Sequence, residues 1–140
     1  MRKTLVAAAA LMLAACGKPT APGIAGQVQL PSPVEVWLTI GGSVVADSTL
    51  RVTFVAVPAD SRCPSSVVCV WQGDAAVAIT SEYVGGGAIA HDTIHLNVEP
   101  RSVQVGGYHV ALLLLGPEPF NTNPIPADEY AARLRIVMRR

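Results

Sequence analysis

The sequence has little charge and no excess of either sign. Ten Lys and Arg residues balance ten Asp and Glu residues, and charged residues make up 14% of the 140 positions. Proteins that bind nucleic acid usually carry a basic patch or a high pI, whereas the pI here is about 6.8, so no nucleic-acid partner is expected. The 51% hydrophobic content also excludes the disordered class. The length suits one domain with its own core.

The sequence lacks an apolar run long enough to cross a membrane. The run from Leu5 to Ala15 has eleven residues, which as a helix reach roughly 16 Å, about half of the hydrocarbon core. Arg2 and Lys3 precede it, and small residues close it. A positive start, a short apolar stretch and small residues before a cleavage point are the parts of a secretory signal. Residues 1–15 are therefore predicted to be a signal peptide.

The end of this run, Leu13-Ala14-Ala15-Cys16, resembles the lipobox of bacterial lipoproteins. The resemblance implies diacylglycerol transfer to the Cys16 thiol, cleavage before Cys16 and acylation of the new amino group, for example by palmitate. Several acyl chains hold a protein durably on a membrane. Gly17 stands where an inner-membrane retention signal would have Asp, so in a two-membrane cell the resemblance implies the outer membrane, facing the periplasm. The alternative is an ordinary secretory signal with Cys16 as a chance thiol.

Only two further cysteines exist, Cys63 and Cys69. An even number of cysteines in an oxidising compartment predicts a disulfide. Their Cα atoms must then lie within about 7 Å, whereas six steps of extended strand span roughly 20 Å, so the segment between them must fold back. Pro64 and the two serines after it supply turn chemistry. A redox pair or a thiolate metal site is the alternative.

The body of the chain has the two-residue periodicity of strands and lacks a helical period over three turns. Residues 16–26 show no periodicity, which predicts a flexible, lipidated tether before a domain at 27–140. The expected strands cover 34–40, 50–56, 75–83, 94–98, 102–105, 108–115 and 130–138. Short strands with turn signals between them predict an all-β fold, a single antiparallel β-sandwich of immunoglobulin-like architecture with about seven strands.

The most distinctive stretch surrounds the two cysteines and comprises Asp60, Ser61, Arg62, Cys63, Pro64, Cys69, Trp71 and Gly73. It resembles a motif of small exported bacterial proteins of unknown function, and a looser likeness continues through Gly107-Tyr108, Pro117/Pro119 and Glu129-Tyr130. The resemblance implies no activity. Physically, Asp60 and Arg62 are expected to pair across the base of a loop, Ser61 to cap its turn and Trp71 to cover the disulfide.

Two interpretations of this loop remain open. It is either a stapled crossover that sets strand register, or a rigid recognition loop made of Asp60, Arg62 and Trp71, with Arg62 at its mouth, since functional residues concentrate on loops held by stiff scaffolds. Residues 116–126 carry four prolines around Phe120. They predict a stiff connection, or a second partner-binding loop if Phe120 is exposed.

Metal and catalytic chemistry have weak support. His91 and His95 share a strand face but lie roughly 13 Å apart, too far to hold one ion, and the sequence does not place His109. No Gly-x-Ser-x-Gly elbow exists. We therefore expect a lipid-anchored, non-enzymatic envelope protein without a cofactor or metal, acting as a binding or structural accessory module toward an envelope partner. The alternatives are a periplasmic metal- or small-ligand-binding module using these histidines and, with least support, a hydrolase.

Overall fold

The computed structural model describes residues 28–139, so the predicted signal peptide, the tether and Cys16 lie outside the described residues. It contains nine strands and one 3-10 helix. The strands are β1 (Val28–Leu30), β2 (Val34–Thr39), β3 (Ser43–Ala46), β4 (Leu50–Asp60), β5 (Ala75–Tyr83), β6 (Ala90–His95), β7 (Ser102–Val105), β8 (Tyr108–Gly116) and β9 (Ala131–Met138), and the helix η1 spans Ala127–Glu129.

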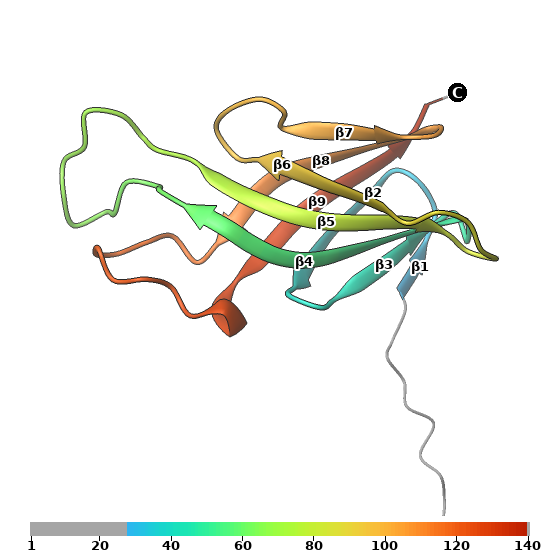
Figure 1. Cartoon of the computed structure of the whole chain (residues 1–140), viewed down its shortest axis with the longest axis horizontal. Coiled ribbons are helices and arrows are strands. Elements are labelled where there is room, and N and C mark those ends of the chain that lie inside the picture. The colour runs from blue at the N-terminus through green and yellow to red at the C-terminus, as the bar shows by residue number, and fades with distance from the viewer. Residues whose placement is uncertain (1–27, 140) are drawn as a thin grey trace, which may run out of the picture.

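The strands form two packed sheets, as Figure 1 shows, so the predicted all-β sandwich is confirmed. One sheet has the order β1-β3-β4-β5-β6, and the other has the order β2-β9-β8-β7. All pairs are antiparallel except β1 with β3. The two strands not expected from the sequence, β1 and β3, have three and four residues, too few to display an alternating pattern.

The core lies between the sheets and is filled by alternate residues of the longer strands. Leu50, Val52 and Phe54 of β4 are fully buried, as are Leu134 and Ile136 of β9. Their neighbours along each strand face outward, as the period of two requires. The buried positions of β9 follow this period as far as Ile136, whereas Met138, which the same alternation would place inward, is 41% exposed.

A bulge explains the continuous apolar run of β8. The register of β8 against β9 shifts between Leu112 and Leu114, so one residue is inserted. Leu112 and Leu115 are buried, whereas Leu114 is exposed. The run is therefore an interior strand of its sheet, between β7 and β9. Its buried residues alternate up to Leu112, and after the bulge the alternation resumes one position later, at Leu115.

Strand β6 begins and ends earlier than the sequence suggests. The alternation of Ile94, Leu96 and Val98 predicts a strand over residues 94–98, but β6 spans Ala90–His95. The backbone N–H of Asn97 donates to the Asp74 carboxylate over 2.8 Å, and its side-chain amide donates to the Gly73 carbonyl. These bonds divert the chain from the ladder.

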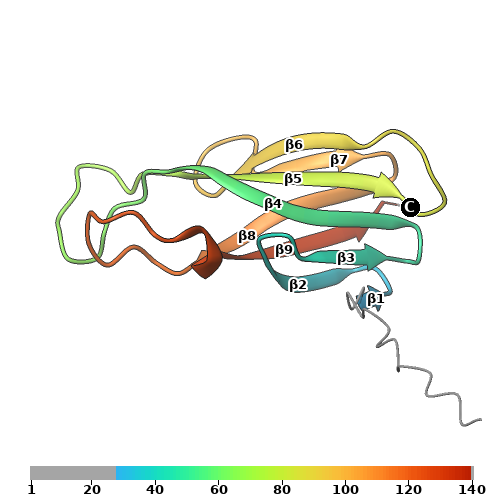
Figure 2. The same cartoon turned by 60° about the horizontal axis from the view of Figure 1, so that its bottom comes forward.

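Two long loops project together from one end of the sandwich, at the left of Figures 1 and 2. They connect β4 to β5 and β8 to β9, while the turns from β3 to β4 and from β7 to β8 lie at the other end. Among residues 28–139, no helix is long and apolar enough to span a membrane.

Candidate functional site

An ion pair closes the base of the loop between β4 and β5. The Arg62 guanidinium donates to both oxygens of the Asp60 carboxylate, from Nε over 2.9 Å and from Nη2 over 2.6 Å. The two side chains are 7% and 13% exposed. Such a two-pronged, charge-assisted contact fixes geometry as well as charge. The expected pairing of Asp60 and Arg62 is thus present in the structure.

The same ion pair ties the two long loops and strand β9 to one another. Arg62 also donates to the backbone carbonyls of Leu115, over 2.6 Å, and Pro117, over 2.9 Å. The Tyr130 hydroxyl, directly before β9, donates to Asp60 over 3.0 Å. The cluster therefore joins three segments that are far apart in the sequence.

The cluster changes the acidity of two of its members. Burial alone would raise the pKa of Asp60, but the hydrogen bonds from Arg62 and Tyr130, together with the Arg62 charge, outweigh it and hold the pKa below its ordinary value of 3.8. Burial and the bond to Asp60 raise the pKa of Tyr130 above 10.0. The charged pair and the neutral phenol are thus the stable forms at neutral pH.

The loop base is extended by hydrogen bonds between its two arms. The backbone N–H of Ser61 donates to the Asp74 carbonyl over 2.7 Å, and that of Cys63 donates to the Gln72 carbonyl over 2.9 Å. The Ser61 hydroxyl bonds to the backbone of Asp74 as both donor and acceptor. Gly73 lies between Gln72 and Asp74, the two residues whose carbonyls accept these hydrogen bonds. Its φ is +71°, and a Cβ there would come within 1.9 Å of the Ser61 carbonyl oxygen. Only glycine permits this approach.

A contact between His95 and Asp74 supports the arm of the loop that leads into β5. His95 Nδ1 lies 2.6 Å from Asp74, whose other oxygen accepts the Asn97 N–H. Burial raises the pKa of Asp74, but these bonds and the His95 charge outweigh it, so that the pKa lies below 3.8. The histidine thus serves the loop base, a use that the sequence did not indicate.

The disulfide closes the loop above this base. Cys63 and Cys69 are bonded, with their Cα atoms 5.9 Å apart, as the sequence predicts. Beyond it, the backbone N–H groups of Ser65 and Ser66 donate to the carbonyls of Pro119 and Phe120. The disulfide loop and the proline-rich loop are therefore joined into one unit, which we call the loop tip, comprising residues 63–72 and 117–122.

The loop tip exposes large apolar side chains. Val68 and Val70 are fully exposed, Phe120 is 72% exposed and Trp71 is 63% exposed, with Val67 half-exposed beside them. Exposed Phe120 and Trp71 fit the partner-binding interpretation, and the covering of the disulfide by Trp71 stays a prediction. The three valines were not singled out from the sequence, where a Val-rich run beside turn residues is also typical of a strand.

Arg62 is placed differently from the expectation that it lies at the mouth of the loop. Four hydrogen bonds hold its side chain inside the base. Asp60 is equally engaged. Both residues hold the base of the loop. The side chains exposed beyond it include the apolar Val68, Val70, Trp71 and Phe120 together with the polar Ser65, Ser66 and Gln72.

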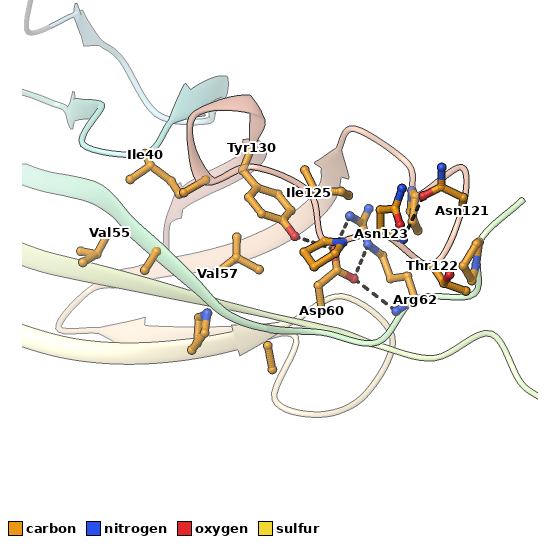
Figure 3. Close-up of a pocket in the computed structure, with 17 residues that line it drawn as sticks. Ile40, Val55, Val57, Asp60, Arg62, Asn121, Thr122, Asn123, Ile125 and Tyr130 are labelled. Atoms are coloured by element: carbon orange, nitrogen blue, oxygen red, sulfur yellow. Dashed lines mark hydrogen bonds and ion pairs between the residues drawn. The ribbon is translucent and has the colours of Figure 1, made fainter.

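A cavity of about 590 Å³ lies beside the loop tip, between β4 and residues 119–127 (Figure 3). One wall is the second half of β4, from Val55 to Asp60, and the opposite wall includes Asn121, Thr122, Asn123 and Ile125. Its size is within the usual range for ligand sites. This cavity was not predicted from the sequence, because its walls come from segments about 60 residues apart.

The histidines are not gathered into one cluster. In the part of the chain that the structure describes, no group of three His, Cys, Asp or Glu side chains converges that could hold a metal ion. His91 and His95 lie four residues apart on β6, and His109 lies on β8 in the other sheet, bonded to Ser102 over 2.9 Å. This Ser-His contact lines neither the 590 Å³ cavity nor a smaller one of 280 Å³ beside Cys63.

Comparisons of this chain with known proteins find no match. No protein-family model matches the chain, and neither a curated protein nor a solved structure matches it. The function is therefore argued from the geometry of the loop tip and the cavity.

Proposed function

We propose that this protein is a non-enzymatic binding module of the cell envelope, anchored through lipid on Cys16, which holds a partner protein with its loop tip. The observation that carries the proposal is the exposure of Val68, Val70, Trp71 and Phe120 on a loop fixed by a disulfide and a buried ion pair. Soluble monomers rarely expose contiguous apolar patches of this kind unless they bind something. A rigid patch also loses little conformational entropy on binding.

The position of the patch suits a tethered module. Val28 of β1, where the described chain begins, pairs with Val44 of β3, and Val44 in turn pairs with Val52 of β4. From Val52, β4 continues to Asp60 at the base of the tip. Eight residues of strand span roughly 26 Å. The tip therefore lies well away from the point where the proposed tether joins the domain.

The charges around the patch favour a protein over an anionic membrane surface. The tip itself, residues 63–72 and 117–122, carries one acidic residue, Glu118, and Asp128 and Glu129 follow in η1. An anionic bilayer repels such a rim. A protein surface with an apolar hollow and a basic rim matches it.

Site-specific photocrosslinking in cells tests the proposal. We expect a photoreactive phenylalanine analogue in place of Val68 to form one discrete protein adduct. The same analogue in place of Ile89, an exposed residue of the β5–β6 loop at the other end of the sandwich, should form none. The purified partner should then bind the Trp71→Ser variant at least about tenfold more weakly, the size expected for an aromatic anchor.

Two outcomes would overturn the proposal. A lipid adduct at position 68 would identify the tip as a membrane-inserting loop. Absence of an adduct, or a partner whose affinity is unchanged by Trp71→Ser and Phe120→Ser together, would leave the tip without a binding role.

A further inference from the structure

We propose that the cavity beside the loop tip is a second binding site, which takes a short, uncharged, extended peptide segment as an added strand on the open edge of β4. Pro64, Pro119, Asn121 and Thr122 of the loop tip contribute to the lining of this site, whereas the exposed apolar side chains Val68, Val70, Trp71 and Phe120 do not. The inference therefore goes beyond the function proposed above. It depends on an unpaired strand edge, on the walls of the cavity and on its charge.

Strand β4 is much longer than the strand beside it. β3 pairs with β4 only from Leu50 to Thr53, and the following turn adds two bonds between Phe54 and residues Gly41 and Gly42. From Val55 to Asp60, no described strand pairs with that edge of β4. An open edge presents backbone donors and acceptors that an extended peptide can satisfy.

The cavity follows this same open edge. Every residue from Val55 to Asp60 lines it, and Ile40 closes one end. Six residues of strand measure roughly 20 Å, which is the length of a five- or six-residue peptide. Figure 3 shows Val55 and Val57 toward one end of the groove, and Asn121, Thr122 and Asn123 of the facing loop toward the other end, beside Arg62.

The opposite wall can bind the outer edge of such a peptide. Asn121, Thr122 and Asn123 carry amide and hydroxyl groups, which both donate and accept hydrogen bonds as peptide groups do. Ile125 and the prolines beside it supply apolar contact for alternate side chains. A peptide lying there would thus have backbone partners on both of its edges.

The charge of the cavity selects a neutral occupant. Its only side chains charged at neutral pH are Asp60 and Arg62, and these neutralise one another. A Lys or Glu placed in the groove would lose its hydration without an unpaired counter-charge, which is costly.

Two features of β4 limit the occupant to a short segment. The register of β4 against β5 shifts between Phe54 and Ala56 and again between Ala56 and Ala59. Pro58 has no N–H to donate. Bulges and proline prevent long, regular sheet addition, so only a few backbone bonds are available and the segment must also fit the walls.

Methyl NMR on the intact protein, purified as the cell produces it and held in phospholipid nanodiscs, tests this site. The probe is a pool of capped hexapeptides built from Ala, Val, Ser, Thr and Gln. The matched control pool has the same composition with alternate backbone nitrogens methylated. Isoleucine and valine methyl groups report separately on the groove, through Ile40, Val55, Val57 and Ile125, and on the tip, through Val67, Val68 and Val70.

We expect the first pool to shift the groove signals saturably and the methylated pool to do so at least about tenfold more weakly, because alternate methylation removes the N–H donors from one of the two peptide edges that the site would hold. Val55→Lys should abolish the shifts, and Val70→Lys, at the tip, should leave them unchanged. Equal shifts from both pools would overturn the added-strand geometry, and shifts confined to the tip valines, or none, would overturn the site. Because Val55→Lys spares the tip and Val70→Lys spares the groove, failure here is distinguishable from failure of the proposed function.

Discussion

The Arg62 guanidinium donates to the Asp60 carboxylate and to the backbone carbonyls of Leu115 and Pro117. Its fork of N–H donors serves all three acceptors at once, which a lysine cannot do. The residue that looks in the sequence like a recognition group therefore acts inside the molecule, where it holds two loops against each other. In the proposed function, a partner would meet the apolar side chains exposed beyond the disulfide.

Loss of this arginine should destabilise the domain strongly. We expect Arg62→Ala to lower the free energy of unfolding by about 3 kcal/mol, since it leaves the Asp60 charge largely buried without its main partner. Arg62→Lys should recover only part of this loss. Arg135→Ala, which removes an exposed side chain 3.7 Å from Glu35, is the control and should cost less than about 1 kcal/mol. Urea unfolding measures all three, and equal effects of Arg62→Ala and Arg135→Ala would contradict the assignment.

The Asp60 carboxyl should make stability depend on pH in the acid range. Because its pKa is lower in the folded than in the unfolded state, the stabilisation is complete above the unfolded value, about 3.9, and is lost as the pH falls through the lower folded value. Asp60→Asn lacks this contribution, and Asp74 supplies a similar one to both proteins.

The urea midpoints of the wild type and Asp60→Asn should therefore converge between about pH 5 and about pH 2. A constant difference over this range would show that ionisation of Asp60 does not support the fold.

At the scale of elements, the segments around Ser61 and Gly73, which join β4 and β5 to the disulfide loop, form one rigid unit with the two long loops. The arms around Gly73 approach so closely that a Cβ there meets the Ser61 carbonyl, and the disulfide closes the loop above them. Ser65 and Ser66 then bond to the proline-rich loop. The positions of Trp71 and Phe120 thus depend on backbone contacts between elements rather than on contacts of their own rings.

Gly73→Ala should therefore disturb the loop base more than an equivalent change elsewhere. Gly41 is a matched control, because its φ is +82° and nothing lies within 4 Å of its Cβ position. Gly41→Ala should cost about 1 kcal/mol for the backbone conformation alone. Gly73→Ala carries the same cost plus a steric clash, so its loss of unfolding free energy should be clearly larger. Equal losses in thermal or urea unfolding would show that the close approach relaxes freely.

The whole molecule combines a sandwich, an apolar tip at one end of that sandwich and a proposed lipid anchor near the N-terminus of the chain. The described sandwich begins at Val28, twelve residues after Cys16. Extended, that many residues reach roughly 40 Å. The proposed anchor therefore lets the tip reach partners well above the membrane surface.

Intact mass of the protein extracted from its native membrane tests this arrangement. We expect a chain that begins at Cys16 and carries acyl groups, and that gains about 2 Da on reduction as the Cys63–Cys69 bond opens. The Cys16→Ser variant should lose the acyl mass and leave the membrane fraction. An unlipidated chain beginning elsewhere would contradict the anchor while leaving the fold and the loop tip unaffected.

The sequence alone predicted most of the strands, because side chains along a strand alternate with a period of two, and the disulfide, because two cysteines remained with a turn between them. It also indicated the pairing of Asp60 with Arg62, which lie two residues apart. Only the tertiary structure decided which way Arg62 faces, that the two loops join at Ser65 and Pro119, and that a cavity lies along β4. Those features depend on contacts between segments distant in the chain, and periodicity and spacing report only on neighbours.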